Sequence, residues 1–366
     1  GAVLASSDLC FWVVVSILVQ TMTLPQKKNK LNVSLRVSAM ERIMFCISGE
    51  GNPMFSKKIT QQLVMLSRLL FVFVLGFTLV SCGASDGDDR PPCVGPLSIG
   101  IHQCGLVSGD YNRYYQMRVP IVYTGAAMPL VLDLHGYGSP VVLGLSGERL
   151  VSGMDRIAQD RGAIVVWPQG VNNGWNSVPS GELREGDIDD VAFLLALVEE
   201  VKQIVNVDES RIYIMGISNG GAMAQVVACE ASRTFAAVST VAFQFPMAPE
   251  DCDLEVPLPM ISFHAPTDSL VRFDGSSQGL PNGGLSAPES YDAWSGINGC
   301  IDDSEVYFEK GDSSCEMRSN CMDDVEVAFC TIDGKGQLLG GHLTYFNNDK
   351  VNLSEKIWDV FSLYQR

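Results

Sequence analysis

Ser218 lies in the segment Gly216-Ile217-Ser218-Asn219-Gly220-Gly221, between an apolar β-branched run and a stretch of small residues. A serine hydroxyl is a poor nucleophile unless a base is near and the backbone holds its oxygen clear of the chain. A sharp strand-to-helix turn provides that exposure, and glycines two residues before and after the serine remove Cβ atoms that would collide in the bend. The segment therefore predicts a nucleophilic serine; the alternative is an ordinary strand-to-helix turn.

The base for such a serine must come from a short list, because the chain has four histidines: His102, His135, His264 and His342. In one recurring order of catalytic triads the acid and then the histidine follow the serine along the chain. Asp268 and His342 satisfy this order, so we expect His342 to act as the base and Asp268 to orient it. Three other carboxylates remain alternatives for the acid: Asp251, Asp253 and Asp274.

Attack on a carbonyl also requires two N–H donors for the developing oxyanion. The backbone N–H of Asn219 follows the nucleophile and lies at the positive end of the predicted helix. The second donor is expected from the glycine-rich loop after the first central strand, where we assign the backbone N–H of Tyr137. His135, just before this loop, is expected to hold it in place and to have no catalytic role.

Three tryptophans could contact the substrate or fill the core. Trp175 lies in the polar segment Asn173-Gly174-Trp175-Asn176 with no obvious core to fill, so we expect it to bind substrate. Trp167 and Trp294 are expected to be buried. The acidic pair Asp189-Asp190 is expected to stabilise the start of a helix.

The elements that must position these residues alternate between strand and helix patterns from about residue 100 onwards. The expected strands are 115–123, 129–135, 163–167, 211–215, 235–243, 258–263 and 325–332. The expected helices are 147–161, 187–205, 219–231, 288–298 and one from Ser354. This alternation predicts an α/β fold: a mostly parallel central sheet with helices on both faces, forming one catalytic domain over residues 99–366.

The charge of the chain changes near residue 82. The whole chain has 25 Lys+Arg and 42 Asp+Glu, whereas residues 1–81 have 8 and 3. Within that basic region, residues 65–81 have a short basic start and a 12-residue apolar core, which is typical of an export signal. The signal ends in Leu-Val-Ser-Cys, which predicts a lipoprotein signal peptide with lipidation at Cys82. Residues 82–98 are then a flexible tether, and residues 1–64 are non-native or disordered.

Eight cysteines follow Cys82, an even number that favours disulfides in an exported protein. Spacing cannot choose among their pairings. The pairs that we expect are Cys93–Cys104, Cys229–Cys252, Cys300–Cys330 and Cys315–Cys321. No metal site is expected, because the chain has no C-x-x-C pair and its histidines are scattered.

The net charge of −17 argues against nucleic acid and anionic membranes as partners, because their phosphates would be repelled. We expect membrane contact only through the lipid anchor, and a monomer. The expected location is the cell envelope of a bacterium, with release from the cell as a further possibility.

Taken together, the motifs of residues 100–345 resemble the secreted esterases grouped with polyhydroxybutyrate depolymerases and feruloyl esterases, carbohydrate esterase family one. The matching segments are His135-Gly136, Trp167-Pro168-Gln169-Gly170, Gly174-Trp175-Asn176, Asp189-Asp190-Val191-Ala192-Phe193, Gly216 to Gly221, and Gly341-His342. The resemblance implies an α/β-hydrolase fold and a triad of Ser218, Asp268 and His342 without a cofactor. Tyr137 stands where depolymerases often have cysteine, and Leu343-Thr344-Tyr345 replaces the common Thr-Trp-Pro.

The expected function is a serine carboxylester hydrolase that works through an acyl-enzyme. Its substrates would be small or oligomeric esters: feruloyl esters, short-chain acyl esters or hydroxyalkanoate oligomers. One alternative is a depolymerase of solid polyester such as polyhydroxybutyrate. Others are a serine peptidase of the prolyl oligopeptidase type and a lipoprotein that uses the hydrolase fold only for binding.

Overall fold

The computed structural model describes residues 90–366, except residues 139–147, 150, 178–187, 277–283 and 344–350. The described residues all belong to one compact unit, Ala84–Arg366. The expected segments 1–64 and 65–81 and the lipidation site Cys82 lie outside the described residues. Among the helices that the structure describes, none is long and apolar enough to cross a membrane.

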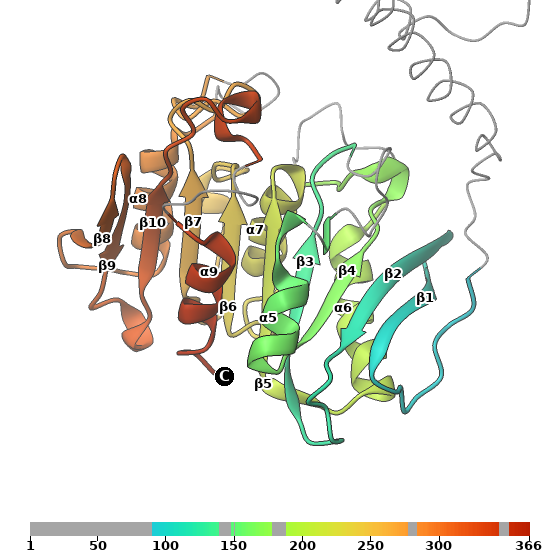
Figure 1. The fold of residues 1–366 in the computed structure, drawn as a ribbon. Helices are drawn as coiled ribbons and strands as arrows, with labels where there is room; N and C mark the ends of the chain where they lie inside the picture. Colours follow the sequence, from blue (N-terminus) through green and yellow to red (C-terminus); the bar gives the residue numbers. More distant parts are fainter. Residues whose placement is uncertain (1–89, 139–147, 150, 178–187, 277–283, 344–350) are drawn as a thin grey trace, which may run out of the picture. The chain divides into compact units, whose positions relative to one another are not determined.

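A mixed sheet runs through this unit (Figure 1). Its strands are β1 (Gly100–Ser108), β2 (Tyr111–Val119), β3 (Met128–Leu134), β4 (Ile164–Pro168), β5 (Val207–Ile217), β6 (Ala237–Val241), β7 (Met260–His264), β8 (Glu305–Lys310), β9 (Ser313–Arg318) and β10 (Val327–Thr331). The order across the sheet is β1-β2-β4-β3-β5-β6-β7-β10-β9-β8. The six strands from β4 to β10 are parallel, and antiparallel pairs continue both edges. The expected mostly parallel sheet is confirmed.

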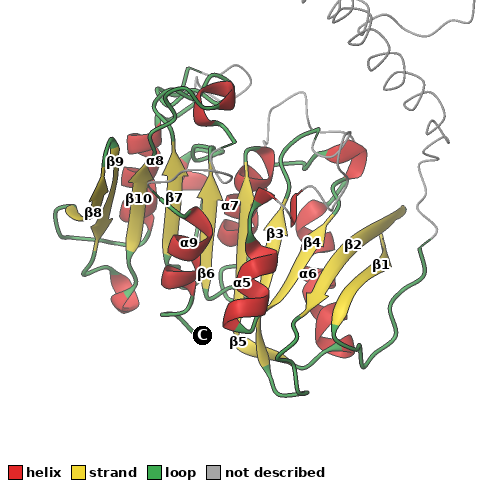
Figure 2. Cartoon of the chain, in the orientation of Figure 1, coloured by secondary structure: helices red, strands yellow, loops and turns green. Residues whose placement is uncertain are grey.

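Helices cover both faces of the sheet (Figure 2). They are α5 (Met154–Arg161), α6 (Asp190–Ile204), α7 (Asn219–Glu230), α8 (Ala287–Ile297) and α9 (Leu353–Phe361). Helices α5 and α9 lie on one face, and α6, α7 and α8 lie on the other. In α9 the residues Leu353, Ile357 and Phe361 are buried, which is the four-residue spacing of a helix with one apolar face.

The parallel strands are buried on both sides, so their side chains alternate between two cores. On β5, Ile212 and Ile214 pack in the core beneath α6, α7 and α8. Tyr213 and Met215 pack in the opposite core, beneath α5 and α9. This double burial explains the nearly continuous apolar run before Ser218, which a sheet with one wet face would not require.

The edge strands differ most from expectation. Strands β1, β8 and β9 are not expected from the sequence. The sequence of β8 has no apolar alternation that would predict a strand, and most of its side chains are exposed. Strand β2 begins four residues earlier than expected and ends at Val119, before Pro120. The early part of β2 contains Arg113, a charge that weakens a strand pattern although its side chain is buried.

Four disulfides stabilise the described part of the chain. The expected pairs Cys93–Cys104 and Cys229–Cys252 are present. The other two expected pairs are wrong: the bonds are Cys300–Cys321 and Cys315–Cys330. Cys315 on β9 lies directly opposite Cys330 on β10, an antiparallel register that could not be deduced without predicting β9. Four disulfides indicate an exported protein, since the reducing cytosol does not preserve them.

The expected tether also needs correction over the residues that the structure describes. Cys93 is bonded to Cys104 of β1, and the N–H of Gly105 donates to the carbonyl of Pro91 at 2.9 Å. The N–H of Leu97 donates to Ile204 at the end of α6 at 3.1 Å. Residues 91–97 are therefore fastened to the domain, whose boundary moves from residue 99 to about residue 90.

Candidate active site

Ser218 occupies a sharp turn between β5 and α7. Its φ and ψ are 54° and −126°, an arrangement that costs about 1–3 kcal/mol and that surrounding structure must maintain. The N–H of Ser218 donates to Val241 O at the end of β6 at 2.8 Å, which ties the turn to the neighbouring strand. A Cβ at Gly216 would collide with the backbone of Gly220. The glycine two residues before the serine is therefore required by close approach, as the motif predicts.

The start of α7 packs tightly against the end of β3. A Cβ at Gly220 would collide with the carbonyl oxygens of Leu134 and His135. A Cβ at Gly136 would meet the Cβ of Ser218 at 3.4 Å. The loop after β3 and the serine turn thus lie in contact, and the close approach requires glycine at position 220.

Asp268 and His342 lie side by side. The Nδ1 of His342 is 2.7 Å from Oδ2 of Asp268, and both side chains are almost completely buried. The Oδ1 of Asp268 accepts from the N–H groups of Leu270 and Val271 at 2.9 and 3.0 Å. Burial alone would raise the pKa of Asp268, but hydrogen bonds from His264 and His342 outweigh it and lower the pKa to about 2. The carboxylate is therefore anionic at neutral pH.

Two hydrogen bonds join the loops that present this pair. The Thr267 hydroxyl donates to Gly340 O at 2.7 Å, and the N–H of Ser269 donates to Leu339 O at 3.2 Å. Gly340 has a φ of 68°, and a Cβ there would collide with the carbonyl of Thr267. These contacts fix the position of the loop after β7 relative to the segment before His342.

The three residues follow parallel strands of one sheet: Ser218 follows β5, Asp268 follows β7, and His342 comes after β10. The carboxyl ends of parallel strands meet at one edge, where sites of such folds form. The alternative acid Asp274 is instead bonded to Arg272 and Ser276 at the surface. Asp268 is the aspartate that the described structure places against His342.

Comparisons with known proteins find relatives over part of this chain. A sequence model of the "Prolyl oligopeptidase family" matches residues 154–267, which include Ser218 and end one residue before Asp268. Feruloyl esterase B from Piromyces equi is 30% identical over 236 residues, which cover 61% of this chain and 42% of that protein. Feruloyl esterase C from Emericella nidulans is 29% identical over 203 residues, covering 54% of this chain and 67% of that protein.

The combination of the parallel sheet, the strained serine turn and these relatives decides the fold. The domain has the α/β-hydrolase fold. A solved structure described as a thermostable esterase is 19% identical, with a TM-score of 0.46, and covers 73% of this chain and 63% of that chain. This chain spans less than half the length of the Piromyces relative.

In this α/β-hydrolase fold the loop after β3 is fixed by His135, as expected. Its Nε2 accepts from the N–H of Gly170 at 3.0 Å, and its Nδ1 donates to Gly136 O at 2.8 Å. Burial, with a smaller contribution from the charge of Arg113, lowers the pKa of His135 to about 4. The ring is neutral at physiological pH and serves the shape of the loop.

The expectation that Trp175 contacts substrate is wrong, because the residue is only 1% exposed. Its indole Nε1 donates to the carbonyl of His135 at 2.9 Å. The side chain of Asn219 accepts from the N–H of Trp175 at 2.7 Å and donates to its carbonyl at 3.0 Å. Trp175 thus connects the start of α7 to the loop after β3. Its polar sequence neighbours concealed this, because their hydrogen bonds point inward.

Trp167 and Trp294 are buried, as expected. Of the acidic pair, Asp189 caps α6 by accepting from the N–H of Ala192 at 2.8 Å, also as expected. Asp190 has a larger role: it is buried and pairs with Arg113 of β2 at 2.7 Å. It also accepts from the N–H of Asn176 at 2.7 Å. No sequence pattern predicts that Arg113 pairs with Asp190, because the two residues are 77 positions apart.

The two assigned oxyanion donors lie on segments that meet beside Ser218. Asn219 begins α7, and Tyr137 follows Gly136, which faces the serine. The N–H of Gly138 donates to Asn173 O at 2.8 Å and ties this loop to its neighbour. The ring of Tyr137 lies over Gly174, and its side chain is 60% exposed.

Within the described residues, no three histidine, cysteine or acidic side chains gather as a metal site would require.

Asp133 of β3 and Glu148 form a buried acidic pair. Asp133 is completely buried and accepts from Trp167 Nε1 at 2.7 Å. Burial raises the pKa of Asp133, against hydrogen bonds from Ser152 and Trp167, to about 7. Burial and the charge of Asp133 also raise the pKa of Glu148. The native protein therefore holds protons that the unfolded chain releases above about pH 4.

We expect Asp133 and Glu148 to make a contribution to the free energy of unfolding that declines as pH rises from about 4 to about 7, because these two groups bind more protons in the native state than in the unfolded state. The lowered pKa of His135 contributes with the opposite sign in the same window. Asp133→Asn keeps an oxygen acceptor for Trp167 and removes one titrating group, so the decline should become shallower by up to about 1.4 kcal/mol per pH unit. Urea unfolding at pH 4.5, 6 and 7.5 measures this slope. Glu148→Gln should act in the same direction; unchanged slopes in both variants would contradict the prediction.

Proposed function

We propose that this protein is a serine carboxylester hydrolase in which Ser218, His342 and Asp268 form the catalytic triad. The observation that carries the proposal is the buried 2.7 Å hydrogen bond between His342 and Asp268, at the sheet edge where the strained turn presents Ser218. A carboxylate on Nδ1 leaves the Nε2 of the imidazole free to act as a base. The relatives named feruloyl esterase support an ester as the substrate.

The reaction would proceed through an acyl-enzyme. Ser218 Oγ forms a bond to the ester carbonyl carbon while His342 takes the hydroxyl proton. The N–H groups of Asn219 and Tyr137 bind the carbonyl oxygen as it becomes negative. The bond to the alkoxy oxygen then breaks, and the leaving alcohol takes the proton from His342. Water next attacks the acyl group and gives a proton to His342, and the acid departs as that proton returns to Ser218.

For the acyl group we propose an aromatic or short apolar chain. With Trp175 buried, Tyr137 is an exposed aromatic residue beside the serine turn. An aromatic ring of this kind can pack against a feruloyl group at little entropic cost. Short-chain acyl esters and hydroxyalkanoate oligomers are the neighbouring substrate classes.

The test is a substrate panel on the whole chain. Methyl ferulate, p-nitrophenyl acetate, a hydroxybutyrate oligomer and a solid hydroxybutyrate polymer represent the ester classes. Hydrolysis of soluble esters supports the proposal, with the highest kcat/KM identifying the acyl class. Release from the solid polymer would identify a polyester depolymerase instead. Failure to hydrolyse any ester, together with failure of Ser218 to react with a fluorophosphonate, would leave a binding protein.

A serine peptidase is the second candidate, because the Prolyl oligopeptidase family model matches residues 154–267. The matched region contains the serine turn but neither Asp268 nor His342. Acyl transfer from an amide uses the same triad as acyl transfer from an ester. The match therefore favours a peptidase only through the region that contains the serine turn. Adding chromogenic peptides to the panel separates the two: a peptidase would cleave them with a higher kcat/KM than any ester.

We further propose that the protein is anchored to the bacterial envelope through a lipid on Cys82. The support is the basic and apolar segment 65–81 followed by Leu-Val-Ser-Cys. Cys82→Ser should move the protein from the membrane fraction to the soluble fraction of expressing cells and abolish incorporation of labelled palmitate. Membrane association that persists without Cys82 would contradict the anchor.

A further inference from the structure

A second histidine contacts the acid of the proposed triad. His264 ends β7, four residues before Asp268, and is 3% exposed. Its Nε2 is 3.5 Å from Oδ2 of Asp268, the same oxygen that lies 2.7 Å from His342 Nδ1. One carboxylate oxygen is therefore flanked by two buried imidazoles. In the proposed mechanism only His342 exchanges protons with the substrate and Ser218.

The protonation of His264 Nε2 follows from its other partner. This nitrogen is 2.8 Å from the carbonyl oxygen of Val271, which can only accept a hydrogen bond. The proton must therefore be on Nε2, and this nitrogen also lies 3.5 Å from Oδ2 of Asp268. Val271 is held at both ends, since its own N–H donates to Oδ1 of Asp268 at 3.0 Å. His264, Asp268 and Val271 form a closed set of contacts.

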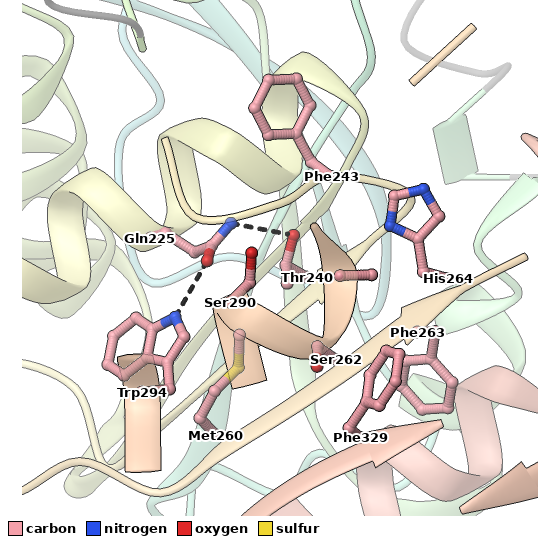
Figure 3. Close-up of a pocket in the computed structure, with 11 residues that line it drawn as sticks. Gln225, Thr240, Phe243, Met260, Ser262, Phe263, His264, Ser290, Trp294 and Phe329 are labelled. Atoms are coloured by element: carbon pink, nitrogen blue, oxygen red, sulfur yellow. Dashed lines mark hydrogen bonds between the residues drawn. The ribbon is translucent and has the colours of Figure 1, made fainter. Parts of the chain in front are cut away.

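The other surroundings of His264 would not replace this contact. The ring packs edge-on to Phe273, with 5.6 Å between centroids. His264 also lines a small cavity, where Figure 3 shows it on the side of the view opposite Trp294. Phe263 and Phe329 contribute apolar walls to the same cavity. Without the imidazole, Oδ2 of Asp268 would lose its second partner. The carbonyl of Val271 would also lose its hydrogen bond, so the segment whose N–H groups hold Oδ1 would be less firmly placed.

We propose that His264 is a positioning residue, which holds the Asp268 carboxylate so that Oδ2 meets His342 Nδ1. The inference rests on the proposed function, in which His342 is the base. His264 would not touch the substrate or the reacting atoms. Its effect would reach the reaction through the orientation of Asp268, and so it would change kcat and leave substrate binding unchanged.

A matched pair of variants tests the role. His264→Gln keeps an N–H donor of similar reach, whereas His264→Met has a similar length and no donor. We expect His264→Met to lower kcat on p-nitrophenyl acetate roughly 10- to 100-fold with KM within about twofold, as small misplacements of catalytic groups do. His264→Gln should recover kcat to within about fivefold of the wild type.

The control is Phe329→Leu, which changes the packing of the same cavity at a residue outside the catalytic machinery. Its kcat should stay near the wild-type value. Equal loss in the methionine and glutamine variants, or in the leucine control, would show that His264 serves packing alone. A parallel rise in KM would also overturn the proposal, because it would place His264 in substrate binding.

A second readout does not depend on turnover. The proton on His342 Nδ1 should give a far-downfield NMR resonance when it is bound to the anionic Asp268. We expect this resonance in the wild type and in His264→Gln, and its loss or upfield shift in His264→Met. If the wild type hydrolyses no ester but the resonance follows this pattern, the proposed function fails while the positioning role stands. A resonance unchanged in His264→Met overturns the positioning role itself.

Discussion

Ser218→Ala is expected to lower kcat for ester hydrolysis by roughly 10⁶-fold, since without the nucleophile no acyl-enzyme forms. KM should change little, because the hydroxyl contributes to the reaction and not to the walls of the site. Initial-rate kinetics on p-nitrophenyl acetate measure the loss. Mass spectrometry should show a fluorophosphonate adduct on the wild type and none on the variant.

The matched control is Ser239→Ala, which removes the same oxygen from a buried serine on β6, in the strand beside the serine turn. Its kcat should remain within about twofold of the wild type, as expected of a residue outside the reaction. A third variant, Ser218→Gly, should be as inactive as Ser218→Ala but more stable by about 1 kcal/mol, because glycine accepts a φ of 54° without strain. Substantial turnover in Ser218→Ala would remove Ser218 from the mechanism.

Asp268→Asn is expected to lower kcat by roughly 10⁴-fold. The asparagine oxygen can replace Oδ1 and accept from Leu270 and Val271, which leaves the amide NH₂ facing His342. An NH₂ donor favours the His342 tautomer with the proton on Nε2, so the nitrogen needed to accept the serine proton is blocked. The kinetics of the purified variant, with circular dichroism to verify the fold, measure the effect.

Asp274→Asn is the matched control for this change. Asp274 is six residues further on, its side chain is 60% exposed, and it is bonded to Arg272 and Ser276. Its replacement should leave kcat within about twofold of the wild type. An Asp268→Asn enzyme with wild-type kcat, or an Asp274→Asn enzyme that loses activity, would assign the acid elsewhere.

The low pKa of Asp268 also sets a pH window. Because hydrogen bonds from the two histidines lower this pKa to about 2, the carboxylate contributes stability above about pH 4 that is lost as pH falls through about 2. Asp133 and Glu148 act with the opposite sign, since their raised pKa values favour the protonated native state. The protein would therefore keep Asp268 ionised in mildly acidic surroundings, where the buried pair of Asp133 and Glu148 is most stabilising.

His135 and Trp175 differ in how well the sequence predicts their roles. The structural role of His135 was predictable, because a histidine before a glycine-rich loop at a strand end has backbone groups within reach. Trp175 was misjudged because its neighbours are polar, although Asn219 binds both its N–H and its carbonyl. The polarity of a segment does not show whether its hydrogen bonds point to water or to the protein.

What the sequence by itself determined is local: the alternation of the central strands and helices, the strand-to-helix turn at Ser218, and its glycines. These features depend on periodicity and on sterics between residues only a few positions apart. The tertiary structure decided which aspartate meets His342, which cysteines pair, that Trp175 is buried, and that His264 also contacts Asp268. These depend on the register of strands distant in the chain, such as β9 against β10, which only packing of the whole sheet establishes.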